Sequence, residues 1–330
     1  MLRIALIGTG GIANGHAQGA EALPDLVQVT ALCDTDPARL ARFSKRFPDA
    51  VAVSDWRELL ARDDIDAFDV CLPHHLHAPC ITDAANAGKH VLCEKPLCMN
   101  EREADAITEA IERNRVTLMC AHNQVFDPAV RRAKQLLDEG AIGHLWQVRT
   151  MDCFTARNYA PGAWGWRGDK ATMGGGVLID TGYHPSYLLL HLAGQRPKSV
   201  CAMVSKHSAN SLEGEDTAEV LVTFENGVRG AIHTSWAYDA PNGNWQFHMI
   251  GDKGQLYGRG NKIYVQPTGF HQGAMIELGA VNVFAEEMRH FAESLQNGTR
   301  PVQDHQDGID VLKLILGAYR SVEEGRIVTF

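Results

Sequence analysis

Short apolar runs alternate with amphipathic stretches through the first third of the chain. The runs are rich in Val, Ile, Leu and Cys and are typical of buried strands, whereas the stretches between them repeat apolar residues at helical spacing. We expect strands at residues 3–7, 27–33, 50–53, 67–72, 90–93 and 117–120, and helices at 12–22, 37–47, 56–61, 76–87 and 101–114. This alternation predicts a parallel sheet with helices on both faces.

The pattern changes to longer strand-like runs after about residue 127. We expect strands at 145–154, 199–207, 218–224, 228–236 and 245–250, and helices at 128–139, 176–192, 281–296 and 304–324. Turn sequences such as Glu225-Asn226-Gly227 separate several of these runs, as in hairpins. The sequence therefore predicts an α/β protein. Residues 1–123 form a doubly wound parallel sheet, and residues 124–330 form an α+β domain with a large, mostly antiparallel sheet. The helix at 304–324 is a candidate to pack back on the first domain.

Composition narrows the class of protein. The 330 residues suffice for two domains, and the 45% hydrophobic and 22% charged residues are ordinary for a globular protein. The net charge of −9 argues against binding to nucleic acid and to an anionic membrane. We expect neither partner. No apolar run is long enough to span a bilayer, and the sequence MLRIALIGTGG is typical of a strand, so we expect a cytoplasmic protein.

The eight cysteines are spread along the chain without a CxxC pair. Several end apolar runs, as Cys33, Cys71, Cys93 and Cys120 do. Because we expect no secretory signal, buried free thiols are favoured over disulfides.

A glycine-rich turn follows the first strand. In the sequence IALIGTGGIA, Gly8, Gly10 and Ala13 form a G-x-G-x-x-A pattern that begins a helix. The first glycine permits a tight turn, the second lets the backbone approach a pyrophosphate, and the small third residue lets helix and strand pack closely. The helix N-terminus favours phosphate. We assign the whole turn, including Thr9, Gly11 and Ile12, to a dinucleotide such as NAD.

The second strand ends on Asp34, where a carboxylate would receive the adenosine ribose hydroxyls. Asp34 and Thr35 are therefore predicted to bind the cofactor, although a turn or capping role is the alternative. A carboxylate repels the 2′-phosphate of NADP, so NAD is favoured and NADP is less expected. Arg39 could weaken that preference.

Polar residues also follow the fourth and fifth strands, whose ends should border the nicotinamide. The fourth leads into Leu72, Pro73, His74 and His77, and the fifth into Glu94, Lys95 and Pro96. Ligands of doubly wound sheets bind beyond these carboxyl ends. Proline restricts the residue before it to extended geometry, which helps to aim the Lys95 amine.

Asp180 and His184 stand four residues apart after three glycines. In a helix, this spacing would place both side chains on one face. For an isolated pair of this kind there are alternatives: Asp180 caps the helix, and His184 is a surface residue or a core residue whose hydrogen bonds are satisfied.

Together, GTGGIA, the Pro73–His77 spacing, AGKHVLCEKP and the pattern of Gly174–Gly176, Asp180 and His184 resemble the glucose–fructose oxidoreductase/inositol dehydrogenase (Gfo/Idh/MocA) family. The resemblance covers nearly the whole chain, including GTRPVQDHQDGIDVLKLI. It implies a Rossmann domain, NAD, and a cluster of Lys95, Asp180 and His184 facing the nicotinamide C4.

The resemblance implies further contacts. It places Pro73 and its neighbours along the nicotinamide ribose, Asn123 near substrate or nicotinamide, and Trp166 and Arg167 near both. Tyr183 is a candidate to line the pocket. Two departures stand out: His74 replaces a small polar residue such as Asn, and no acidic residue closely follows His184.

The residue types suit oxidation of a secondary alcohol of a sugar, sugar derivative or cyclitol. We assign His184 as general acid/base, Lys95 as its electrostatic partner and Asp180 as a substrate orienter. The sequence leaves open whether Lys95 is itself the base.

Several alternatives remain. A relative that retains NAD for glycoside cleavage or epimerisation is one, and a non-catalytic NAD-binding regulator is another. Zinc bound by His74, His75, His77 and Cys80 is disfavoured, because the Lys–Asp–His set makes a metal unnecessary; we expect none. A large sheet with helices on one face leads us to expect a homodimer or homotetramer.

Overall fold

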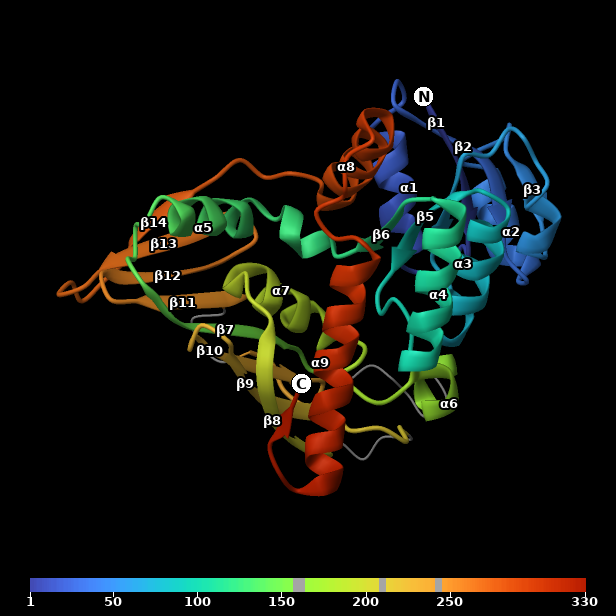
Figure 1. Cartoon of the computed structure of the whole chain (residues 1–330). Coiled ribbons are helices and arrows are strands. Elements are labelled where there is room, and N and C mark those ends of the chain that lie inside the picture. The colour runs from blue at the N-terminus through green and yellow to red at the C-terminus, as the bar shows by residue number, and fades with distance from the viewer. Residues whose placement is uncertain (157–163, 208–211, 241–244) are drawn as a thin grey trace. The chain divides into compact units, whose positions relative to one another are not determined.

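The structure is a computed structural model that describes residues 1–156, 164–207, 212–240 and 245–330. The chain forms two compact units (Figure 1). The first contains Met1–Asn123 and Asn282–Ile309, and the second contains Gln124–Val281 and Asp310–Phe330. These two compact units do not by themselves show which ligand each one binds. The division into a nucleotide domain of residues 1–123 and a substrate domain of residues 124–330 therefore stays a prediction.

A six-stranded parallel sheet forms the centre of the first unit and confirms the predicted fold class. Its strands, in the spatial order β3-β2-β1-β4-β5-β6, are β1 (Leu2–Ile7), β2 (Val27–Cys33), β3 (Val51–Val53), β4 (Ala67–Val70), β5 (His90–Glu94) and β6 (Leu118–Ala121). The helices are α1 (Ala13–Glu21), α2 (Pro37–Ser44), α3 (His77–Asn86), α4 (Glu101–Asn114) and α8 (Val283–Asn297). The predicted helix at 56–61 is a 3-10 turn, Trp56–Leu59.

The strand order reverses between β1 and β4. Because crossovers between parallel strands are right-handed, helices on the two sides of this reversal cover opposite faces of the sheet. All six strands run in one direction, so their carboxyl ends lie along one edge. The strands β4 and β6 are buried throughout, as expected for a sheet covered on both faces.

Asn100 is the N-cap of α4. Asn100 Oδ1 accepts a hydrogen bond from the Glu103 N–H at 3.0 Å. Glu103 returns a bond to the Met99 N–H at 2.9 Å, one residue earlier than in the standard capping box. The helix therefore begins where the sequence predicts.

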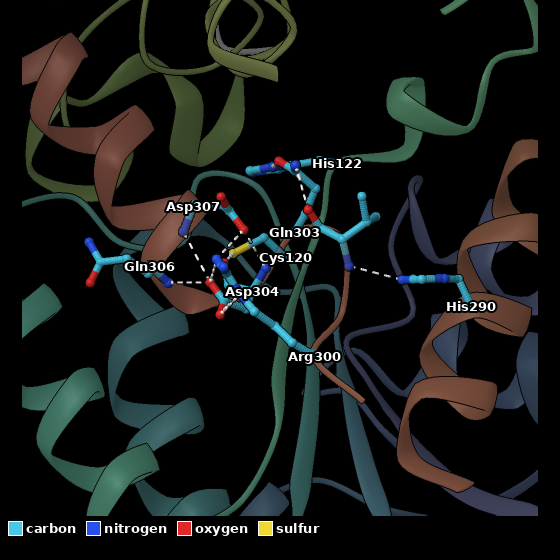
Figure 2. Close-up of polar contacts among 9 residues, drawn as sticks. Cys120, His122, His290, Arg300, Gln303, Asp304, Gln306 and Asp307 are labelled. Carbon is cyan, nitrogen blue, oxygen red and sulfur yellow. Dashed lines mark hydrogen bonds and ion pairs between the residues drawn. The ribbon is translucent and has the colours of Figure 1, made fainter. Parts of the chain in front are cut away.

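A polar cluster joins β6 to the chain that returns before α9 (His305–Glu324), as Figure 2 shows. The Cys120 N–H donates to the Gln303 carbonyl at 2.8 Å, and His122 Nδ1 lies 2.6 Å from Gln303 Oε1. Arg300 forms ion pairs with Asp304 and with Asp307. These contacts attach the returning segment to the carboxyl end of β6.

A nine-stranded sheet forms the second unit. Its order is β14-β13-β12-β11-β7-β10-β9-β8-β15, with β7 (Leu145–Cys153), β8 (Pro197–Ser205), β9 (Thr217–Phe224), β10 (Arg229–Ser235), β11 (Phe247–Gly251), β12 (Gly254–Arg259), β13 (Lys262–Pro267), β14 (Ala274–Glu277) and β15 (Val328–Thr329). All neighbours pair antiparallel except β7 and β10. The mostly antiparallel character is confirmed, whereas β12, β13, β14 and β15 were not predicted.

The helices of the second unit are α5 (Pro128–Asp138), the one-turn α6 (Lys170–Met173) and α7 (Tyr183–Ala193), with most of α9. The prediction of one helix over residues 176–192 is wrong at its start. Gly176 lies against Glu215, where an added Cβ would stand 2.2 Å from the Glu215 carbonyl oxygen. The Val177 N–H donates to that carbonyl at 2.9 Å, so the segment is held as turns until α7 begins.

Each of the eight cysteines is a free thiol, and seven of them are buried. Their burial agrees with the predicted strand positions, since Cys33 and Cys93 lie within strands of the first sheet. Within the described ranges, every helix is too short or too polar to cross a bilayer.

Candidate active site

The glycine-rich turn has the geometry that the sequence predicts. Gly8 has a φ of +90°, and a Cβ there would lie 2.5 Å from the Cys71 carbonyl oxygen, so only glycine fits without strain. Added Cβ atoms at Gly10 and Gly11 would meet nothing within 4 Å. Ala13 is fully buried where α1 packs on the sheet. The turn therefore presents open backbone at a helix N-terminus, which suits a pyrophosphate.

Asp34 holds this turn from the end of β2. Its Oδ2 accepts hydrogen bonds from the Thr9 N–H at 2.7 Å and the Thr9 hydroxyl at 2.8 Å, and its Oδ1 accepts one from the Asp36 N–H at 2.8 Å. The neighbouring Thr35 is exposed. The Asp34 carboxylate thus stabilises the backbone conformation of the glycine-rich turn around Gly8.

Arg42, which the sequence reasoning missed, lies beside the same turn. Its Nη2 donates to the Thr9 carbonyl at 3.2 Å. Arg39, the arginine that the sequence singled out, pairs instead with Asp36, with Nε 3.2 Å from Oδ2. Arg42 lies eight residues beyond Asp34, so only the helical periodicity of α2 could have indicated that its side chain lies near the turn.

His77 joins the chain segments that follow β4 and β5. It is fully buried, with Nδ1 2.7 Å from the Pro96 carbonyl oxygen and Nε2 2.8 Å from the Leu72 carbonyl oxygen. Burial lowers its pKa, although both carbonyls favour the charged ring. A neutral ring has one N–H, so it donates to one of the two carbonyls while it packs between the two strand ends.

The fifth strand ends on Glu94, which is 5% exposed. One carboxylate oxygen, Oε2, accepts a hydrogen bond from the Lys95 N–H at 3.0 Å. The other, Oε1, lies 3.1 Å from Nε2 of His16 on α1. The Lys95–Pro96 peptide bond is cis. Glu94 thus fixes the backbone of Lys95 at the carboxyl edge of the sheet.

One group in the described ranges has donor atoms close enough together for a metal ion: His16, Asp69 and Cys71. Metal ligation requires a thiolate, but burial raises the pKa of Cys71 to about 12. His16 also directs both ring nitrogens at carboxylates. Hydrogen bonding accounts for this group better than metal binding does. It shares no residue with the zinc candidates His74, His75, His77 and Cys80.

In the second unit, Asp180 lies before α7 rather than in it, because the N-cap of that helix is Gly182. The expected shared helical face with His184 is therefore wrong. Asp180 is 4% exposed and accepts a hydrogen bond from Arg167 Nε at 2.6 Å. The Arg167 guanidinium lies 4.3 Å from the ring centroid of Trp166. The Trp-Arg pair and Asp180 therefore form one cluster.

His184 is in the first turn of α7. Its Nδ1 lies 2.9 Å from the hydroxyl of Tyr187, which accepts a hydrogen bond from the Gln124 N–H at 3.2 Å. The sequence reasoning missed Tyr187, which is 1% exposed and whose signal is its position three residues after His184. Tyr183 is fully buried in the core.

Polar contacts continue from Gln124 to Asp127. Gln246 Nε2 donates to Gln124 Oε1 at 2.7 Å and to Asp127 Oδ2 at 3.2 Å. Asp127 precedes α5 but its side chain makes no capping bond. Burial raises the pKa of Asp127 to about 6, even though the bond from Gln246 opposes this shift. Asn123 begins a 3-10 turn, Asn123–Phe126, at the end of the first unit's opening segment.

The glycine-rich turn, Asp34 and the alternating sheet define a dinucleotide-binding domain of the Rossmann class. Comparison with known proteins agrees. A family model described as "Oxidoreductase family, NAD-binding Rossmann fold" matches residues 2–122, and one described as "GFO/IDH/MocA C-terminal domain" matches residues 130–257. The chain belongs to the GFO/IDH/MocA family and is an NAD-binding oxidoreductase.

Individual relatives span the chain. It is 26% identical to myo-inositol 2-dehydrogenase of Thermotoga maritima over 99% of this chain and 98% of that protein. It is 27% identical to levoglucosan dehydrogenase of Pseudarthrobacter phenanthrenivorans over 77% and 73% of the two chains. A solved structure of levoglucosan dehydrogenase in complex with NADH and levoglucosan has a TM-score of 0.91 at 24% identity, covering 99% of both chains. This last likeness concerns the fold.

Asp127 gives a prediction about pH and stability. Because its pKa in the folded protein is about 6 and its ordinary value is 3.8, the folded state binds the proton more tightly. This group's contribution to stability is therefore present at about pH 4 and is lost as pH rises through 6. We expect Asp127→Asn to gain about 2 kcal/mol relative to wild type between pH 4 and pH 7. Urea unfolding across that range measures the difference, and parallel curves for the two proteins would contradict the assignment.

Proposed function

We propose that this protein transfers a hydride between NAD and a secondary alcohol or ketone of a sugar, a sugar derivative or a cyclitol. The observation that carries the proposal is the end of β5, where the Glu94 carboxylate fixes the backbone of Lys95 at the edge to which a doubly wound sheet directs its ligands. The names of the relatives, a myo-inositol 2-dehydrogenase and a levoglucosan dehydrogenase, support this substrate class.

In the proposed reaction, Lys95, Asp180 and His184 act on the substrate carbon that carries the hydroxyl. Oxidation of an alcohol releases a hydride to the nicotinamide and a proton to a base. The imidazole of His184 suits that base, and the ammonium of Lys95 stabilises the developing alkoxide. In the alternative, a neutral Lys95 amine is the base, and a protonated His184 donates a hydrogen bond to the substrate oxygen.

Tyr187 bears on this choice. Its hydroxyl oxygen accepts the Gln124 N–H, and the same oxygen lies 2.9 Å from His184 Nδ1. The contact holds the orientation of the His184 ring. Tyr187 thus serves as a positioning residue for His184.

Asp180 acts with Arg167 as a pair in this proposal. The carboxylate is 4% exposed, whereas the Arg167 side chain is 40% exposed. Arg167 therefore has donors directed to solvent while it neutralises Asp180. Since a guanidinium presents five N–H donors, it suits the hydroxyl-rich substrates that the relatives' names indicate.

The cofactor preference follows from the turn around Gly8. Both Asp34 oxygens carry negative charge where the adenosine ribose would bind, which favours NAD over NADP. Arg42 donates to the Thr9 carbonyl and could receive a 2′-phosphate if Asp34 were absent. Residues Leu72, Pro73, His74 and Asn123 complete the proposed cofactor contacts, with Trp166 beside the substrate. His77 and Tyr183 are fully buried and support the site from within the core instead of contacting a ligand.

Two further parts of the proposal concern assembly and location. On β9, Leu221 is 59% exposed and pairs with Cys201 of β8, and Met203 nearby is 79% exposed. The opposite face is covered where Leu189 of α7 packs against Gly230. Large apolar side chains exposed on this sheet face support a homodimer or homotetramer. The eight free thiols support a reducing, cytoplasmic compartment.

Turnover tests the reactive residues. We expect Lys95→Met and His184→Ala each to lower kcat by about 10²–10⁴-fold, because each removes a group that acts on the proton or the developing charge. NADH formation across a panel of sugars, sugar acids and inositols is the measurement. Lys198→Met, an exposed lysine of β8, and His271→Ala, an exposed histidine, are matched controls that should retain near-normal rates.

Tight NADH retention without net release during turnover would instead favour the glycoside-cleaving or epimerising alternative. NAD binding with no activity on any substrate would favour a regulator.

Cofactor preference is tested by Asp34→Ser. We expect kcat/KM for NAD to fall about 10–100-fold and that for NADP to rise, because the repelling carboxylate is gone. Adding Arg42→Leu should cancel the gain with NADP. Asp36→Ser keeps an N-cap hydroxyl two residues away and should leave the preference for NAD unchanged. Equal efficiencies with NAD and NADP in wild type would refute the role of Asp34.

Assembly is tested by sedimentation velocity. Leu221→Asp places a charge in the centre of the exposed sheet face and should dissociate the oligomer. Val51→Asp, at an exposed apolar position of the first sheet, is the control. A monomeric wild type at micromolar concentration would contradict the predicted dimer or tetramer.

A further inference from the structure

A histidine outside the proposed reaction lies at the centre of the first unit. His16 is in the opening turns of α1, close behind the glycine-rich turn, and is 1% exposed. Its Nδ1 lies 2.8 Å from Asp69 Oδ1 on β4, and its Nε2 lies 3.1 Å from Glu94 Oε1 on β5. One side chain thus links the helix that carries the glycine-rich turn to two neighbouring strands.

The partners of His16 determine its charge. A neutral imidazole has one N–H and one lone pair, so it can satisfy only one of two carboxylates. A ring with both nitrogens protonated satisfies both. Although burial opposes the charge, the Asp69 carboxylate raises the pKa of His16 well above its ordinary value. His16 is therefore an imidazolium held between Asp69 and Glu94.

Burial favours the neutral form of the remaining titratable groups around His16. Burial raises the pKa of Glu287, on α8, well above its ordinary value, and raises that of Cys71 to about 12. Glu287 is 1% exposed, and its Oε1 has no hydrogen-bond partner among the described residues, which suits a protonated acid. The carboxyl groups within hydrogen-bond distance of the His16 ring are thus those of Asp69 and Glu94.

Close packing fixes the position of this cation. The ring of Phe284, on α8, lies 5.5 Å from the His16 ring, centroid to centroid. The same phenylalanine packs against two glycines of α1: a Cβ added to Gly15 would lie 2.6 Å from its ring, and one added to Gly19 would lie 2.8 Å from its carbonyl oxygen. Because α8 and α1 approach so closely, His16 has little room to move.

We propose that His16 is a positioning residue whose imidazolium fixes Glu94 and, through the Glu94 bond to the Lys95 N–H, sets the placement of the Lys95 amine. This inference rests on the proposed role of Lys95 and names the residue that makes that role possible. Glu94 uses one oxygen for His16 and the other for the Lys95 backbone, so a shift of His16 is transmitted directly to Lys95. The same contact ties the glycine-rich turn to the reactive edge.

The protonation state is tested on the wild-type protein by NMR of ¹⁵N-labelled histidine, with the His16 signals assigned from His16→Gln. We expect both ring nitrogens to remain protonated at pH 8, well above the ordinary histidine pKa of about 6.5. A His16 ring that titrates near its ordinary value would overturn the proposal. This readout requires no substrate and no folded variant beyond the assignment.

The action through Glu94 is tested by a double-mutant cycle. We expect His16→Gln to lower kcat about 10–100-fold, because a misplaced amine loses its alignment with the reacting carbon, while the dissociation constant of NADH changes less than about threefold. In a Glu94→Gln background, the same substitution should have little further effect on kcat. Equal losses in the two backgrounds would show that His16 does not act through Glu94.

Glu287→Gln is the matched control, because an amide replaces a neutral acid of similar shape in the same buried group. It should retain kcat within about twofold. A purely structural role for His16 would lower the melting temperature and leave kcat unchanged, which would overturn the proposal.

Placement of Lys95 can also be followed without turnover. The ¹⁵N signal of the Lys95 amine, assigned from Lys95→Met, should shift in His16→Gln and stay unchanged in Glu287→Gln. If no substrate of the panel is oxidised, the proposed function fails, but the two NMR measurements still decide the role of His16. An unshifted Lys95 signal in His16→Gln refutes that role even in an active enzyme.

Discussion

The first unit depends on a buried cation between two buried carboxylates. Removing charges from water is costly, and such a group persists only if each charge has a close opposite partner and good hydrogen-bond geometry. His16 meets that condition from α1, while Asp69 and Glu94 come from adjacent parallel strands. The three residues belong to three separate segments, so these contacts form only when the helix and both strands are in their final positions. The carboxyl edge of the sheet is therefore specified by charge as well as by packing.

Much of the first unit could be predicted from its sequence. Buried parallel strands are short continuous apolar runs, and the helices between them carry recognisable signals, such as the Asn100 cap of α4. The glycine-rich turn and the carboxylate at Asp34 were predicted from their spacing alone, and the structure joins them directly through Thr9. Secondary structure can be predicted from the sequence where each helix or strand is determined by interactions among its own residues.

The second unit was harder to predict because its elements depend on distant partners. Gly176 begins no helix, since the segment that follows is bonded to Glu215, almost 40 residues later. The strands β13 and β14 lack a clear alternation of buried and exposed residues, and every residue of β14 is exposed, so the sequence signal was weak. Likewise, Arg167 and Asp180 are 13 residues apart, and Tyr187 meets the backbone of Gln124 across 63 residues. No short window contains such pairs.

The course of the chain through the two units has a consequence for synthesis. The cluster around His16 is closed by α8, whose residues lie near the end of the sequence. As the protein leaves the ribosome, the six strands of the first sheet emerge long before Phe284 and Glu287 do. Until then, the surface of α1 that α8 will cover stays exposed to solvent and to chaperones. The first unit, whose strands are synthesised first, is thus complete only after α8 has been synthesised.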